Sequence, residues 1–139
     1  MFRRFMNKTL LICLLISYPI SVVAQESIVF SGYPISGVTS SADSTSQRAI
    51  SGDEATEYRV LIVKIGNRYF WASRENKELF HFQSGIAHWF ISESSGYIKI
   101  IDPSLVDGAE PTSQFVYMEH LTLVLNTITY WGVGSQLNP

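Results

Sequence analysis

Residues 115–131 read FVYMEHLTLVLNTITYW, and this stretch decides the fold class. Its large apolar residues fall at i, i+4, i+7, i+8 and i+11: Tyr117, Leu121, Val124, Leu125 and Ile128. This spacing draws one apolar stripe along a helix. Pro111 just ahead of the stretch supplies a start, and the β-branched residues after Asn126 favour a final strand. We therefore expect a helix that ends near Asn126.

The chain before this stretch is rich in strand patterns. Five strand-like runs are separated by turn residues: 58–65, 68–73, 79–83, 86–92 and 97–102. The Gly66-Asn67 pair between the first two predicts a two-residue hairpin. Period-two alternation in the last two predicts a second hairpin. We expect an α+β domain, in which an antiparallel sheet of four to five strands carries one helix from the C-terminal half on one face.

The N-terminus has the layout of a secretory signal peptide. Arg3, Arg4 and Lys8 precede an almost wholly apolar run, Thr9–Val23, and a cut after Ala24 would leave small or apolar residues before it. The run is shorter than the roughly 20 residues that a membrane-spanning helix needs. An uncleaved anchor and a twin-arginine signal are the alternatives.

The rest of the chain divides by composition. Residues 25–56 are dominated by Ser, Thr, Gly, Ala and Asp, which predicts a flexible leader or tether. We expect one globular domain over residues 57–134, followed by a loose tail at 135–139.

Removal of residues 1–24 changes the chemistry that is available. The only cysteine, Cys13, leaves with the signal, so no thiol remains for a disulfide, a thiolate metal site or a nucleophile. Seven basic residues then stand against twelve acidic ones. This balance disfavours a nucleic-acid partner and docking on an anionic membrane. We expect no cofactor and no stable membrane insertion, and a bacterial periplasmic or secreted location.

Two constellations could support catalysis. The histidines His81, His88 and His120 are candidate metal ligands, but their spacing matches no known metal motif. A hydrolase could use Ser84 with His88 or His120 and Glu119, although Ser84 lacks the glycines that hold a catalytic serine on a strained turn. Neither pattern predicts a catalytic or metal site.

Aromatic side chains give the clearest indication of binding. Four of them lie in or beside predicted strands and are candidate contact residues: Trp71, Trp89, Tyr130 and Trp131. The sequence therefore favours a non-catalytic exported module that binds a protein or cell-envelope partner. One alternative is a small periplasmic hydrolase or metal-dependent enzyme. Another is a structural subunit of an envelope assembly, in which residues 28–30 would pair with a second copy.

Overall fold

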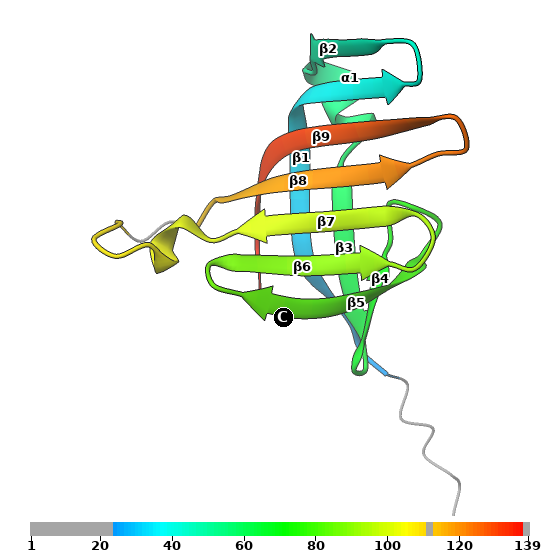
Figure 1. Cartoon of the computed structure of the whole chain (residues 1–139). Helices are drawn as coiled ribbons and strands as arrows, with labels where there is room; N and C mark the ends of the chain where they lie inside the picture. Colours follow the sequence, from blue (N-terminus) through cyan, green and yellow to red (C-terminus); the bar gives the residue numbers. More distant parts are fainter. Residues whose placement is uncertain (1–23, 111–112, 138–139) are drawn as a thin grey trace, which may run out of the picture.

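The computed structural model describes residues 24–110 and 113–137, and nearly all of its regular structure is β (Figure 1). The strands are β1 (Glu26–Ser41), β2 (Thr45–Ala49), β3 (Val60–Ile65), β4 (Arg68–Trp71), β5 (Lys77–Ser84), β6 (Ala87–Ser92), β7 (Gly96–Ile101), β8 (Phe115–Thr122) and β9 (Asn126–Ser135). A short helix, α1 (Gly52–Glu57), and one 3-10 turn (Pro103–Leu105) complete the elements. The expected signal peptide lies outside the described residues except for Ala24.

Eight of the strands form a closed antiparallel barrel. From β3 to β9 each strand pairs with the next one in the chain, and β1 pairs with both β3 and β9. Closure depends on the length of β1, since residues 26–32 pair with β3 and residues 31–41 pair with β9. β2 pairs with the outer half of β1 and lies beside α1 at the upper end of Figure 1.

The predicted α+β class is wrong, because residues 115–131 form β8, a hairpin tip and β9 in place of a helix. Tyr117, Glu119 and Leu121 follow one another at period two on β8, and Glu119 is fully buried. A carboxylate at an inward position breaks the apolar alternation by which a strand is recognised. Both predicted hairpins are confirmed, as the pairing of Ile65 with Arg68 shows for the first.

The core fills the barrel. Its buried members come from seven of the eight barrel strands: Val29, Phe30, Val60, Ile62, Trp71, Leu79, Phe90, Ile98, Ile100 and Tyr117. Phe30 and Tyr117 meet edge to face, with ring centroids 5.5 Å apart. Burying each large apolar side chain contributes about 1.5–3 kcal/mol, so a chain of this size gains a stable core without disulfides.

The structure differs from the expected leader and domain start. Residues 26–57 contain β1, β2 and α1, so the barrel begins well before residue 57. The small residues of β1 fit because the neighbouring strands supply the bulk. At Gly37, for example, an added Cβ would lie 3.0 Å from the Tyr130 ring. Of the expected tail, Leu137 packs against the core.

Candidate functional site

The outer wall of the barrel carries a row of large side chains, one from each strand between β5 and β9. Its members are direct cross-strand neighbours: Phe82, Trp89, Lys99, Met118 and Trp131. Alternate residues of a strand point to opposite faces, so an antiparallel register places these five on one side of the sheet. Together with Tyr97, we call them the outer aromatic face.

Trp89 lies at the centre of this face and contacts three of its members. Its ring stacks on Phe82, with centroids 6.2 Å apart and planes inclined by 7°. Tyr97 packs against it at 5.6 Å, and the Lys99 ammonium lies 5.0 Å from its centroid. The Tyr97 ring in turn stacks on His120 at 5.2 Å. These contacts fix the side chains in place, which lowers the entropy lost when a partner binds.

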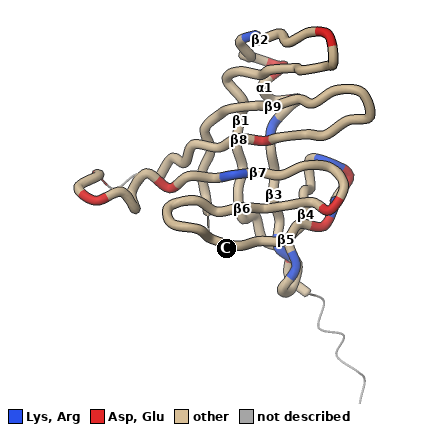
Figure 2. The backbone as a smooth tube through the Cα atoms, viewed as in Figure 1, with Lys and Arg blue, Asp and Glu red and all other residues tan. Residues whose placement is uncertain are grey.

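The outer aromatic face carries one charge. Along β6 to β9 the charged residues are Lys99 and Glu119, and the Glu119 side chain is buried inside the barrel (Figure 2). Phe82, at the β5 edge of the face, is 48% exposed. An apolar surface around a single cation is therefore open to solvent.

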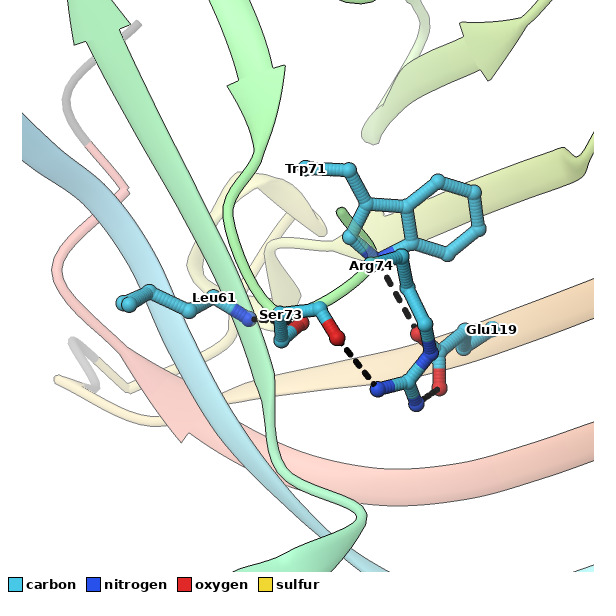
Figure 3. A network of polar contacts seen from close by, with 5 residues as sticks. All are labelled: Leu61, Trp71, Ser73, Arg74 and Glu119. Carbon is cyan, nitrogen blue, oxygen red and sulfur yellow. Dashed lines mark hydrogen bonds and ion pairs between the residues drawn. The ribbon is translucent and has the colours of Figure 1, made fainter. Parts of the chain in front are cut away.

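Inside the barrel, Glu119 is the centre of a polar network (Figure 3). The Trp71 indole N–H donates to its Oε1 over 3.0 Å, and Arg74 Nη2 donates to its Oε2 over 2.8 Å. Arg74 Nη1 also donates to the Ser73 carbonyl over 2.9 Å, while the Ser73 hydroxyl accepts from the Leu61 N–H. The network thus ties β8 to β3, to β4 and to the segment that follows β4.

Burial controls the titration of this network. It raises the pKa of Glu119 to about 7, because the loss of solvation outweighs the favourable charge and hydrogen bond of Arg74 and the hydrogen bond of Trp71. Burial, and then the nearby Glu119 carboxylate, also raise the pKa of Tyr117 well above its usual range. The Tyr117 hydroxyl has no hydrogen-bond partner among the described residues.

The four aromatic residues singled out from the sequence fall into two environments. Trp71 and Tyr130 are buried inside, where Tyr130 stacks on Tyr58 with centroids 5.5 Å apart. Trp89 and Trp131 lie on the outer aromatic face. Sequence reasoning missed the face as a unit, because the strand expected as a helix contributes Met118. For the members of the face on β6 and β7, the alternation in residues 86–92 and 97–102 was the available indication.

The structure brings His81 and His88 together but leaves the other candidate catalytic and metal-binding residues apart from them. His81 Nε2 and His88 Nδ1 are 3.1 Å apart, and burial is the main cause that lowers the pKa of both rings. His120 lies outside, where its Nδ1 is 2.9 Å from the Thr129 hydroxyl. Ser84 ends β5 at an exposed turn, and Glu119 is engaged with Trp71 and Arg74. Within residues 24–110 and 113–137, no cluster of three or more metal-ligating side chains is present.

Comparisons with models of protein families, with curated proteins and with solved structures give no match for this chain. In the part of the chain that the structure describes, no helix is long and apolar enough to cross a membrane.

Proposed function

We propose that this chain is an exported, non-catalytic binding module that docks a protein partner on the outer aromatic face. The observation that carries the proposal is the register row from Phe82 to Trp131, which presents two tryptophans around one lysine. Trp and Tyr dominate binding energy at protein interfaces because they bury a large, rigid area. The expected signal peptide would deliver the module to the periplasm or the medium.

The charge of the face indicates the chemistry of the partner. Lys99 is held against the Trp89 ring, and no carboxylate stands at an outward position of β6 to β9. A second copy docked by the same face would bring a second Lys99 and no acid to receive it, which is unfavourable. The face suits a different protein, one that presents a carboxylate among apolar side chains.

The alternatives lack comparable support. An enzyme built on His88, His120 and Glu119 would need groups that lie in three separate environments. A structural subunit that pairs through residues 28–30 would need a free strand edge, yet those residues belong to β1 and pair with β3 of the same chain. A binding module requires neither rearrangement.

Capture of a partner from extract, followed by a direct binding measurement with the purified partner, tests the proposal. Immobilised wild type, the double variant W89A/W131A and the control F70A are exposed to envelope extract, and specifically captured proteins are identified by mass spectrometry. Phe70 is an aromatic residue of β4, outside the outer aromatic face, beside Arg68. The purified partner is then titrated by calorimetry.

We expect W89A/W131A to weaken binding by about 30-fold or more, as for loss of interface anchors, and K99E to weaken it by about tenfold. F70A should bind like the wild type. A partner that binds W89A/W131A as tightly as the wild type would overturn the proposal, as would the absence of any direct binding.

A further inference from the structure

A separate cavity opens at one end of the barrel, where the β4–β5, β6–β7 and β8–β9 connections meet. Its volume is about 660 Å³, which lies within the range of small-molecule sites. The turns between β6 and β7 and between β8 and β9 lie together at the right of Figure 1. The outer aromatic face does not line this cavity, so the cavity is a site separate from the one proposed to dock a protein.

Arg74 lines the cavity and retains unused donors. Its guanidinium has five N–H groups, of which one bonds to Glu119 and one to the Ser73 carbonyl. The remaining three have no partner among the described residues. The side chain is only 18% exposed, so an anion that reached it would form charge-assisted hydrogen bonds with little competition from water.

Apolar side chains also line the cavity. Leu121, Leu123 and Val124 line it from the end of β8 and the adjoining hairpin tip. Val124 is 99% exposed, a position that offers it no contribution to the core. A cation and apolar side chains in the lining of one cavity match a ligand with one charged and one apolar end.

We propose that this cavity binds a small amphipathic anion. Its carboxylate or phosphate oxygens would accept from the free N–H groups of Arg74, because a planar guanidinium matches both head groups. Its apolar tail would lie against Leu123 and Val124.

The other charged groups of the cavity are compatible with this ligand. Lys77 adds a second cation and Glu75 adds a carboxylate to the lining; the Lys77 Nζ lies 3.9 Å from that carboxylate, whose side chain is 86% exposed and therefore well screened by solvent. Glu119 lies beneath Arg74, and its raised pKa means that near neutral pH its negative charge only partly offsets the guanidinium. The side of the cavity around Arg74 and Lys77 therefore favours an anion.

Calorimetric titration of the purified protein tests the site. The probes are sodium octanoate and octyl phosphate, which distinguish the two head groups, with 1-octanol as the neutral probe of equal tail length. For ligands of this size we expect a Kd of about 0.1–1 mM for at least one anion. Octanol should bind about tenfold more weakly than that anion.

Two matched variants of the hairpin tip locate the site without disturbing the core. V124D places a carboxylate in the cavity, whereas L125D alters the next residue, which is 85% exposed and does not line it. We expect V124D to weaken anion binding by about tenfold and L125D by less than about twofold. The double variant R74Q/E119Q, which leaves no unpaired buried charge, should also bind about tenfold more weakly.

Three results would each overturn the proposal. The first is equal affinity for octanol and the anions, and the second is an equal effect of V124D and L125D on anion affinity. The third is that no anion binds at a concentration 10-fold above the highest expected Kd. If R74Q/E119Q does not fold, the hairpin pair still decides the question. The variant W89A/W131A should retain anion binding in full, which separates this proposal from the partner-binding one.

Discussion

Replacing Glu119 by glutamine should change how the stability of the barrel depends on pH. Glu119 is fully buried, and its pKa rises from 4.5 to about 7 on folding. Between these values the folded chain holds a proton that the unfolded chain has lost, so the free energy of unfolding falls as the pH rises. The fall is about 3 kcal/mol by pH 8. Glutamine cannot titrate, so the free energy of unfolding of E119Q should rise by about 3 kcal/mol relative to that of the wild type between pH 4.5 and pH 8.

The assay is urea unfolding followed by tryptophan fluorescence, with both proteins measured at several pH values from 4.5 to 8. E78Q serves as the control, because Glu78 is exposed and its pKa is lowered by Arg68, so its effect is small and of opposite sign. If the difference between the free energies of unfolding of the wild type and E119Q changes by less than about 1 kcal/mol over this range, the reasoning is refuted.

Three further predictions concern the core, the barrel seam and the histidine pair. W71A should lower the free energy of unfolding by about 3–5 kcal/mol, since it removes a buried indole and its hydrogen bond to Glu119. W89A should lower it by about 1 kcal/mol, and thermal melts compare the two variants. In the same melts, G132A should lower the free energy of unfolding by about 2–3 kcal/mol, because the added Cβ would meet the backbone carbonyl of the facing strand. A G132A protein as stable as the wild type would exclude tight packing of β9 against β1. The pKa values of His81 and His88 are lowered on folding, so these two rings lower the stability as the pH drops from 7 to 5, against the rise that Glu119 contributes. Over this drop, the free energy of unfolding of H81Q/H88Q should therefore rise relative to that of the wild type in urea titrations.

The strands of the barrel were largely accessible to sequence reasoning, but its closure was not. Residues 58–102 carry local patterns, either continuous apolar runs or strict alternation, and these depend on near neighbours alone. Closure depends on β1, whose residues 31–41 contain little bulk and pair with β9, some 90 positions away. Gly37 fits there because Tyr130 lies opposite, and no local pattern in the leader reports an aromatic ring supplied by another strand.

The candidate site was predictable in part. Trp89 and Trp131 were singled out correctly as aromatic residues in strands, but their placement in one row requires the register across β7 and β8. Trp71 has the same sequence character and lies in the core. Inward and outward aromatics of a barrel strand differ by one position of register, so composition cannot separate them.

Glu119, the inward residue that interrupts the apolar alternation of β8, also has its pKa strongly raised by burial in the barrel interior. With leucine at position 119, inward positions 117, 119 and 121 would alternate as plainly as Ile98 and Ile100 of β7, and a strand would be expected. A buried carboxylate costs stability unless its partners compensate, and here Trp71 and Arg74 offset part of that cost from a different part of the chain. Arg74 is thereby held, partly buried, beside the cavity at the barrel end. Glu119 thus positions the one cation that both the buried network and the proposed anion site require, which gives a physical reason for a charge at an inward position of β8.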